Sequence, residues 1–425
     1  MSSWTLRQAG PFRGEIAPPG DKSISHRAAI LGALAEGETH ITNFLPSEDC
    51  LNTVRSLRLM GIRIDEHSAT ELTVHGGDLC EPGTILDCGN SGTGLRLLAG
   101  VCAGQPFLSI LTGDESIRRR PMKRICDPLR KMGATILARK GDLAPLAIRG
   151  GGLQGIEFES PVASAQVKSA LLLAGLFAEG PTVVREPSLS RDHTERMLRS
   201  FGAQITCEEL TVTLKPGARL GGQPVDVPGD ISSAAFFIVG ALICPGSELR
   251  VKNVGLNPTR TGLLDALRAM GADISVSDER ELSGEPVGTL TVRHSALRAG
   301  EFGGSLIPRM VDEVPVLALA ACFAEGETVI RDAQELAVKE SDRLATVTST
   351  LAAFGADVER TSDGMIIRGG ASLTGAPVLS HGDHRIAMMA AVAARCIAGE
   401  TQVQDVDCVN TSFPGFLPML ESVTR

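Results

Sequence analysis

The chain has 425 residues, enough for two or three domains of roughly 150 residues that each bury a core. Hydrophobic residues make up 43% and charged residues 21%, which is typical of a soluble globular protein and too apolar for a disordered one. Lys and Arg total 41 against 50 Asp and Glu, and only 13 Phe and one Trp supply aromatic rings other than His. A net charge of −9 with so few rings argues against a nucleic-acid surface, so an anionic partner must meet local clusters of positive charge.

The chain also lacks the marks of a membrane or secreted protein. Its longest apolar stretch, Ala234 to Cys244, stops at Pro245 and is shorter than the roughly 18 to 20 residues of a membrane span. The first ten residues contain no basic segment followed by an apolar one, so we expect no secretory signal. The ten cysteines form no CxxC pair, and most lie in apolar runs. We therefore predict a cytoplasmic protein with buried, reduced thiols and no membrane partner.

A repeated unit organises the chain from about residue 19 onward. Each copy begins with a short polar or Gly-containing motif, continues as an Ala/Leu-rich helix and ends that helix at a Gly before a β-type run. A second, amphipathic helix then closes with Met-Gly or Phe-Gly. The closing glycines are Gly61, Gly133, Gly202, Gly271 and Gly355, so the copies are 69 to 84 residues apart. The pattern predicts helix, strand, helix, strand in each copy, with Gly as the left-handed residue after each helix.

The repeats also define two domains. A sixth copy, GDHRIAMMAAVAARCIAGETQV, reaches the C-terminus without a closing strand, which we expect residues 1–18 to supply. The motif PPGDKSIS at Pro18 has a counterpart, VPGDISSA, at Val227, and this offset of 209 nearly halves the chain. We predict an α/β fold of two similar domains with three repeats each, residues 19–228 and residues 229–425 with 1–18. The chain would cross between them near Pro18/Pro19 and Pro228/Gly229.

The opening motifs are the candidate ligand sites. All six, GDKSISHR, GNSGTGLR, SAQVKSA, GDISSA, VDEVPVL and GDHRIAM, stand directly before an apolar helix. Helix N-termini carry unpaired N–H groups and partial positive charge, so anions bind there. Basic residues gather at these points or between the helices: Lys22, Arg27, Arg96, Arg118–Arg120, Lys123, Arg124, Lys168, Arg191, Lys339, Arg343 and Arg385. A solvated surface role is an equal alternative for any one of them, but the set predicts two small polyanionic ligands in a cleft between the domains.

Other ligand sites are disfavoured by spacing. Asp21 separates Gly20 from Lys22, so the segment is not a P-loop, and GxGxxG is absent. His381 and His384 have HxxH spacing, but no HExxH motif or cysteine ligands accompany them, which disfavours a metal site.

Nine motifs taken together resemble the 5-enolpyruvylshikimate-3-phosphate synthase family of enolpyruvyl transferases across essentially the whole chain. They are PGDKSISHR, LDCGNSGTGLRLLAG, RRRPMKR, SAQVKSALLLAG, SRDHTERM, VDEVPVLALAA, VKESDRL, DHRIAM and TSFPGF. The resemblance implies two domains of three βαβαββ-type units, each an inside-out α/β barrel, joined by a two-crossover hinge that closes on substrate. It also implies transfer of the enolpyruvyl group of phosphoenolpyruvate to the 5-hydroxyl of shikimate 3-phosphate. Phosphate leaves by addition–elimination without metal or organic cofactor, as a step of the shikimate pathway to chorismate and the aromatic amino acids.

The resemblance also assigns residues. The residues that match shikimate 3-phosphate contacts are Lys22, Ser23, Arg27, Ser164, Gln166, Asp312 and Lys339. Those that match phosphoenolpyruvate contacts are Lys22, Gly92, Arg120, Gln166, Arg343 and Arg385. Lys22, Asp312 and Glu340 match the catalytic groups: Asp312 would accept the proton of the 5-hydroxyl, and Glu340 would serve the methylene carbon. From the residues alone, Asp312 could instead be a helix N-cap, and Glu340 with Asp342 a solvated helix face.

Three positions depart from patterns of the family. Many members carry a Lys in the segment where this chain has Val409–Pro414, some have Ser at the place of Ala165, and some have Arg at the place of Ala337. Gly92 is Gly and not the Ala of some glyphosate-insensitive relatives, so we expect glyphosate to inhibit. We also expect a monomer.

Two rival functions remain. The related transferase acting on UDP-N-acetylglucosamine begins with a Lys-Asn pair and has a loop cysteine. Here Ser23 follows Lys22, and Asp114–Arg120 contains no cysteine. A non-catalytic repeat protein that binds anionic metabolites would leave Asp312 and Glu340 without a role.

Overall fold

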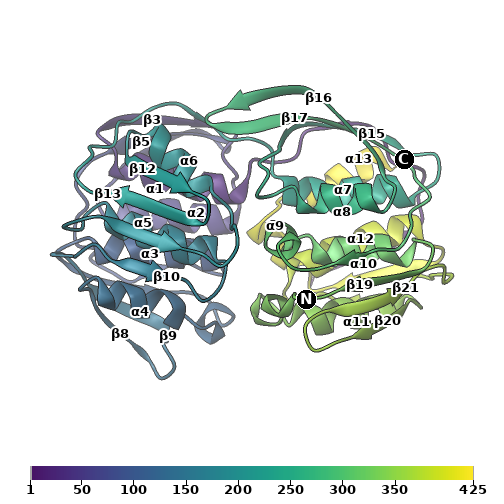
Figure 1. The fold of residues 1–425 in the computed structure, drawn as a ribbon. Coiled ribbons are helices and arrows are strands. Elements are labelled where there is room, and N and C mark those ends of the chain that lie inside the picture. Colours follow the sequence, from purple (N-terminus) through teal and green to yellow (C-terminus); the bar gives the residue numbers. More distant parts are fainter. Residues whose placement is uncertain (1, 425) are drawn as a thin grey trace. The chain divides into compact units, whose positions relative to one another are not determined.

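The computed structural model describes residues 2–424, which group into two compact units. The N-terminal unit comprises Gly20–Val227 with Leu282–Glu285. The C-terminal unit comprises the residues through Pro19, Pro228–Glu281 and the residues from Pro286 on. Figure 1 shows helices and short strands alternating along the chain in both units.

The N-terminal unit contains three repeats. The first has α1 (Lys22–Leu34), β3 (Gly37–Thr42), α2 (Glu48–Leu59), β4 (Arg63–Ser68), β5 (Glu71–Gly76) and β6 (Leu86–Asp87). The second has α3 (Gly92–Ala103), β7 (Leu108–Thr112), the 3-10 helix η1 (Ile117–Arg119), α4 (Lys123–Lys131), β8 (Thr135–Arg139), β9 (Leu143–Arg149) and β10 (Glu157–Glu159). The third has α5 (Ala165–Gly175), β11 (Thr182–Arg185), α6 (His193–Ser200), β12 (Gln204–Glu208), β13 (Thr211–Lys215) and β14 (Val225–Asp226).

The C-terminal unit follows the same order. Its first repeat has α7 (Ile231–Ile243), β15 (Glu248–Gly255), α8 (Gly262–Ala269), β16 (Asp273–Leu282), β17 (Glu285–Arg293) and β18 (Glu301–Phe302). The second has α9 (Leu306–Met310), α10 (Val314–Cys322), β19 (Glu327–Ile330), η2 (Gln334–Val338), α11 (Arg343–Ala353), β20 (Asp357–Arg360), β21 (Met365–Arg368) and β22 (Pro377–Leu379). The last has α12 (His384–Cys396), β23 (Glu400–Gln404), η3 (Val406–Thr411) and α13 (Phe416–Val423), and β1 (Ser3–Arg7) and β2 (Arg13–Ile16) come from the other end of the chain.

The strands link each repeat to the next. The last short strand of a repeat pairs in parallel with the first strand of the following sheet, as β6 does with β7 and β10 with β11. In the N-terminal unit β14 returns to β3, so the three sheets are connected in a ring. The expectation of helix, strand, helix, strand was therefore incomplete. Each full repeat has two more strands: one that pairs antiparallel within its own sheet, and a short last strand that pairs with the sheet of the next repeat.

The expected barrel is a ring of separate open sheets, not one continuous closed sheet. Within residues 2–424 there are six sheets, five with four strands and one with three. The three-stranded sheet belongs to the sixth repeat, where β1 pairs antiparallel with β23. β2 pairs in parallel with β15 and closes the ring of the C-terminal unit. The prediction that residues 1–18 supply the missing strand is confirmed.

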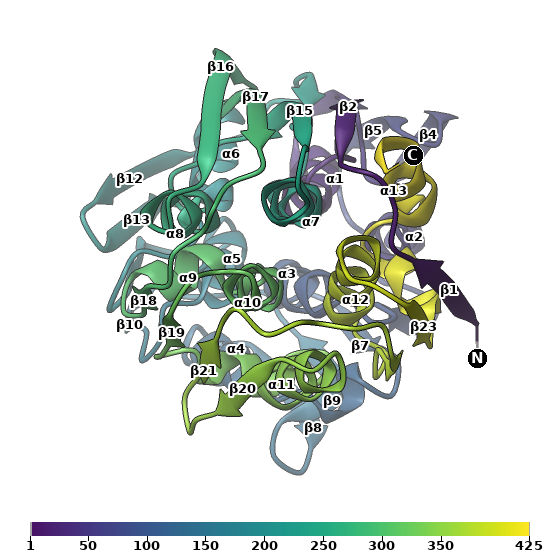
Figure 2. The ribbon, with the colours of Figure 1, turned by 90° about the vertical axis from the view of Figure 1, so that its right-hand side faces the viewer.

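The first helix of each repeat forms the centre of its unit. Every residue of α7 is buried, and α7, α10 and α12 pack against one another. In Figure 2 these three helices lie inside the strands of the C-terminal unit. The second helices bury only one side: the buried residues of α2 include Cys50, Thr53, Val54 and Leu57, which have the spacing of one helix face. A helix that is apolar on all sides needs packing on all sides, which the ring of sheets provides.

Glycine ends the second helices as the sequence predicts. Gly61, Gly133, Gly202, Gly271 and Gly355 all have φ between +89° and +113°. This left-handed conformation is costly for residues with a Cβ atom, which explains why each copy closes with Gly.

The expectation of buried thiols holds for most cysteines but not for all. All ten are free, and six are buried, but Cys80 and Cys207 are exposed. In the part of the chain that the structure describes, no helix combines the length and the apolar character needed to cross a bilayer.

The crossing of α3 and α5 depends on a missing side chain. A Cβ atom at Gly100 would lie 2.3 Å from the carbonyl oxygen of Ala170 on α5. We expect Gly100→Ala to lower the free energy of unfolding by about 1–3 kcal/mol, because overpacking outweighs the roughly 1 kcal/mol that Ala gains over Gly in a helix. Urea denaturation measures this. Gly77→Ala, where nothing lies within 4 Å of the added atom, is the control, and equal stability of both variants would contradict the close approach.

Candidate active site

The six opening motifs all lie at helix N-termini. The side chains of Asp21, Ser91, Asp230 and Asp383 accept hydrogen bonds from the first turns of α1, α3, α7 and α12. Ser164 and Glu313 are the N-cap residues of α5 and α10, and neither makes a capping hydrogen bond with its side chain. The prediction that these motifs begin helices is confirmed, and each N-terminus presents amide N–H groups and partial positive charge within its own unit.

Lys22 and Arg27 are held on α1 in the N-terminal unit. The Lys22 ammonium lies 3.0 Å from Asp49 at the start of α2 and stays 18% exposed. The Arg27 guanidinium is buried and donates to the carbonyl of Ser23, 2.8 Å away, and to the hydroxyls of Ser169 and Thr194. Burial lowers the pKa of Arg27 to about 10, against the attraction of nearby carboxylates, so it remains a cation at neutral pH.

A second group lies where α3 and α5 begin. The Gln166 side chain donates to the Thr93 hydroxyl at 3.0 Å and accepts a hydrogen bond from the Arg96 guanidinium. A Cβ atom at Gly92 would lie 3.0 Å from the guanidinium of Arg120. Gly92, Arg120 and Gln166 therefore surround two adjacent helix N-termini, as an anion-binding role requires.

Lys168 does not fit the expected role of a ligand-binding cation. Its side chain is only 1% exposed, and the ammonium lies 2.6 Å from Glu186 and 2.7 Å from Glu195. The sequence predicted that Lys168 belongs to a set of ligand-binding basic residues. No local signal indicated that two carboxylates beyond β11, Glu186 and Glu195, form ion pairs with it.

In the C-terminal unit, the Arg343 guanidinium contacts both candidate catalytic carboxylates, Asp312 and Glu340. Its guanidinium is 1% exposed and lies 3.1 Å from Asp312, 2.6 Å from Glu340 and 2.8 Å from Asp383. Burial disfavours the charged form, but the three carboxylates prevail and raise the pKa of Arg343 above its usual value. Glu340 is thus not a solvated helix face.

Asp312 is not the helix N-cap that the sequence allowed. Glu313 occupies that position, and the Asp312 carboxylate accepts a hydrogen bond from Arg343. The side chain therefore serves a polar cluster instead of its own helix. Asp342 caps α11 and lies 2.9 Å from Arg360.

Lys339 and Arg385 complete the group in this unit. Burial lowers the pKa of Lys339, and the charges of Asp312 and Glu335 partly oppose the shift. Arg385 is buried at the start of α12, donates to the carbonyl of Ser232 at 3.2 Å and lies over the Phe236 ring. Its backbone N–H donates to Asp383, which also binds Arg343.

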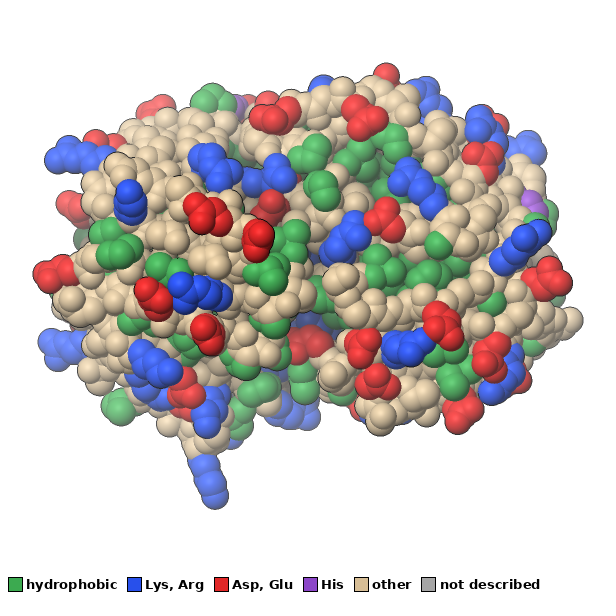
Figure 3. All heavy atoms as spheres, in the orientation of Figure 1, with side chains coloured by type: hydrophobic (Ala, Val, Ile, Leu, Met, Phe, Trp, Pro, Cys, Tyr) green, Lys and Arg blue, Asp and Glu red, His purple; other side chains and the backbone are tan. Residues whose placement is uncertain are grey.

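Figure 3 shows acidic and basic side chains interspersed over the visible face. The visible face therefore carries no broad basic patch.

The segment Val409–Pro414, where many family members have Lys, offers no comparable cation. Asn410 is exposed, and the Thr411 hydroxyl donates to the carbonyl of Cys408 at 2.7 Å.

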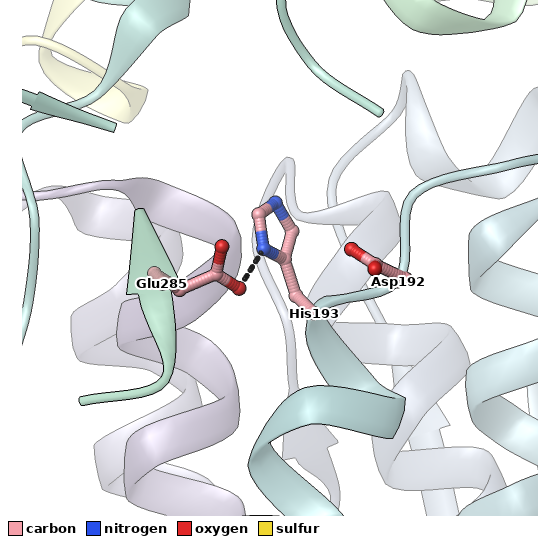
Figure 4. A group of neighbouring side chains, drawn as sticks. All are labelled: Asp192, His193 and Glu285. Carbon is pink, nitrogen blue, oxygen red and sulfur yellow. Dashed lines mark hydrogen bonds and ion pairs between the residues drawn. The ribbon is translucent and has the colours of Figure 1, made fainter. Parts of the chain in front are cut away.

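One group of three residues has the composition of a metal site. Asp192, His193 and Glu285 place their ligand atoms within 4.8 Å of one another, and Figure 4 shows the His193 ring between the two carboxylates. The His193 Nδ1 lies 2.7 Å from Glu285, and Asp192 accepts a hydrogen bond from Arg196 at 2.8 Å. Because a cation would have to displace these interactions next to Arg196, we assign no metal to the group. His381 and His384, at HxxH spacing, are not part of it.

The fold and these clusters define an α/β protein, built of repeated units, with cationic side chains near its helix N-termini. Solved structures with this architecture include EPSP synthase from Acinetobacter baumannii, at 43% identity and a TM-score of 0.89, with 100% of this chain and 98% of that chain covered. The 3-phosphoshikimate 1-carboxyvinyltransferase of Desulforudis audaxviator is 57% identical over 98% of both chains. That of Citrifermentans bemidjiense is 52% identical over the full length of both.

A family model described as EPSP synthase (3-phosphoshikimate 1-carboxyvinyltransferase) matches residues 6–420. The chain belongs to this family. The resemblance drawn from the nine sequence motifs is confirmed.

His26 lies in the core between the clusters of the N-terminal unit. It is fully buried, its Nδ1 is 2.8 Å from the Thr53 hydroxyl, and burial together with the charges of Lys22 and Arg27 lowers its pKa to about 3. The unfolded chain binds a proton near pH 6.5 and the folded chain does not, so stability falls as pH drops from 6.5 towards 3.

We expect this one residue to remove about 2 kcal/mol of stability between pH 7 and pH 5. His26→Gln keeps a polar group beside Thr53 but cannot be protonated, so it should lose correspondingly less over this range. Urea denaturation of both proteins at the two pH values measures the difference. Parallel losses in the two proteins would show that His26 is not the group responsible.

Proposed function

We propose that this protein transfers the enolpyruvyl group of phosphoenolpyruvate to the 5-hydroxyl of shikimate 3-phosphate and releases phosphate. Membership of the EPSP synthase family over nearly the whole chain supports this reaction. The observation that carries the mechanism is the set of contacts of Arg343, which holds Asp312 and Glu340 by one guanidinium. Two carboxylates beside one buried cation suit a reaction that moves a proton at two different atoms.

The proposed binding roles follow the charges of the substrates. Phosphoenolpyruvate carries a carboxylate and a phosphate, and Arg120, Arg343 and Arg385 are the guanidinium groups assigned to it. Shikimate 3-phosphate would contact Ser23, Arg27, Ser164, Gln166 and Lys339. Lys22 would contact both, and Gly92 would let phosphoenolpyruvate approach the N-terminus of α3. The assigned residues come from both units, so the proposed reaction needs both.

In the proposed addition, Glu340 gives a proton to C3 of phosphoenolpyruvate and the 5-hydroxyl oxygen attacks C2 while Asp312 accepts its proton. The tetrahedral intermediate then collapses: C3 returns a proton to Glu340, the C2–O bond to phosphate breaks, and the enol ether forms. The proton held by Asp312 leaves with the released phosphate, so both carboxyl groups return to their starting states. General acid–base catalysis contributes about 10²- to 10⁴-fold, and holding two substrates in place can contribute more.

The alternatives explain less. Neither the family nor the relatives favour a UDP-N-acetylglucosamine transferase. A protein that only binds anions gives no reason for Asp312 and Glu340 to share Arg343.

Glyphosate would inhibit the proposed reaction. A Cβ atom at position 92 would lie 3.0 Å from the Arg120 guanidinium, and because Gly92 lacks this atom the space beside the guanidinium stays open. The protein would act as a monomer. Its location would be cytoplasmic.

We expect Lys22→Ala and Arg385→Ala each to lower kcat/KM by about 100-fold or more, because each removes a charge that balances the substrate anions. Phosphate release after mixing shikimate 3-phosphate and phosphoenolpyruvate with the protein measures the effect, and it tests the proposed function in the unmodified chain.

The matched control is Arg130→Ala. Like Lys22→Ala it breaks an ion pair to an aspartate, here Asp142 at 2.8 Å, but Arg130 is not assigned to a substrate. It should keep near-normal turnover. A Lys22→Ala or Arg385→Ala protein with the rate of the control would refute the role given to that residue.

The pH profile tests the assignment of Lys339. Burial already lowers its pKa, and Glu335, 3.7 Å from the ammonium, partly restores it. If charged Lys339 is required, activity falls as pH rises through this pKa. We expect Glu335→Gln to move the alkaline limb of kcat/KM to lower pH, because the opposing charge is lost. Glu359→Gln, an exposed carboxylate near Arg368, is the control and should leave the profile in place. An unmoved limb in Glu335→Gln would argue against Lys339 as the titrating group.

A further inference from the structure

A buried ionic network lies under the N-terminus of α5. Glu186 follows β11 and accepts hydrogen bonds from the Lys168 ammonium at 2.6 Å and the Ser190 hydroxyl at 2.9 Å with one carboxylate oxygen. The other oxygen accepts the backbone N–H of Ser164 at 3.1 Å. Lys168 also lies 2.7 Å from Glu195, and all three charged side chains are at most 3% exposed.

The two carboxylate oxygens of Glu186 bind two residues that lie one helical turn apart, Ser164 and Lys168. Ser164 is the N-cap of α5, and Lys168 lies one turn further along, with its N–H bonded to the Ser164 carbonyl at 3.0 Å. Because the Ser164 side chain makes no capping hydrogen bond, its hydroxyl is not committed to its own helix. The position of this hydroxyl is set by the backbone, and Glu186 fixes that backbone.

We propose that Glu186 is a positioning residue for shikimate 3-phosphate, acting through Ser164 at the N-terminus of α5. This inference rests on the proposed function, in which Ser164 contacts that substrate. Glu186 itself is buried and negative, so it does not serve as a ligand of a phosphate. Its charge is compensated by Lys168, which explains why this lysine is withdrawn from the ligand-binding set.

Both carboxylate oxygens of Glu186 act as hydrogen-bond acceptors. A glutamine at this position has one carbonyl oxygen and one NH₂ group, which is only a donor. If the oxygen faces Lys168, the NH₂ group faces the Ser164 N–H, and two donors meet. The Ser164 N–H then loses its acceptor, and the turn that carries the hydroxyl is no longer fixed.

We expect Glu186→Gln to raise the KM for shikimate 3-phosphate about 10-fold, because one buried hydrogen bond that orders a binding group is lost. The KM for phosphoenolpyruvate and kcat should change by less than about threefold, since the assigned guanidinium groups do not contact Glu186. Steady-state rates of phosphate release with each substrate varied in turn give the three constants, and thermal unfolding reports the stability of the same protein.

Glu195→Gln is the matched control. It removes a carboxylate of the same kind from the same ammonium, but it is Glu186 and not Glu195 that accepts the Ser164 N–H. It should therefore lower the melting temperature comparably and leave the KM for shikimate 3-phosphate within about twofold. Glu186→Asp is a second variant for the case that the glutamine variant does not fold. It keeps the charge for Lys168 but is one methylene shorter, so it should fold and still raise the same KM.

The outcomes separate the two proposals. If the unmodified protein releases no phosphate from the two substrates, the proposed function fails. If it turns over and the folded Glu186 variants keep its KM for shikimate 3-phosphate, the positioning role alone is overturned. An equal rise of this KM in Glu195→Gln would also overturn it, because the network would then act only through general stability.

Discussion

The architecture depends on the burial of one apolar helix from each repeat. Helices such as α7 have no polar side, so they are stable only when other helices and sheets surround them. The ring of three sheets in each unit meets this requirement, and the strand that each repeat gives to the next sheet closes the ring. The polar ends of the buried helices are then the places where the chain can present N–H groups and charge. The proposed function therefore places the binding chemistry at helix N-termini.

Placing cations at such positions requires acidic partners. A guanidinium taken out of water loses its hydration, and only nearby carboxylates or several hydrogen bonds offset that loss. Arg343 has three carboxylates, and Arg27 has two hydroxyls and a carbonyl. In the proposed reaction two of the Arg343 partners also transfer protons. The same side chains would thus stabilise the empty site and perform the chemistry when substrate is present.

Much of this could be predicted from the sequence, because the signals are local. Helix starts, closing glycines and the repeat period depend on residues close together in the chain, and the motifs carried the resemblance to the family. The pairing of β6 with β7 and the hairpin tip Leu282–Glu285, which groups with the N-terminal unit, were not predicted. Neither were Asp49 and Glu186 as partners of lysines. These interactions join residues far apart in sequence, and a carboxylate in a loop has no local feature that identifies its partner.

Lys22 and Lys168 illustrate what the sequence leaves open. Each lies near the start of a buried helix, within an opening motif, and the sequence predicted both to be ligand-binding cations. Lys22 sits at the first position of α1 and keeps 18% of its side chain exposed, so its ammonium can exchange water for a substrate anion. Lys168 lies one turn inside α5, 1% exposed, between two carboxylates that leave the group with an excess of negative charge. The exposure and the acidic partners of the two lysines differ because of residues distant in the sequence, and only the three-dimensional structure supplies both.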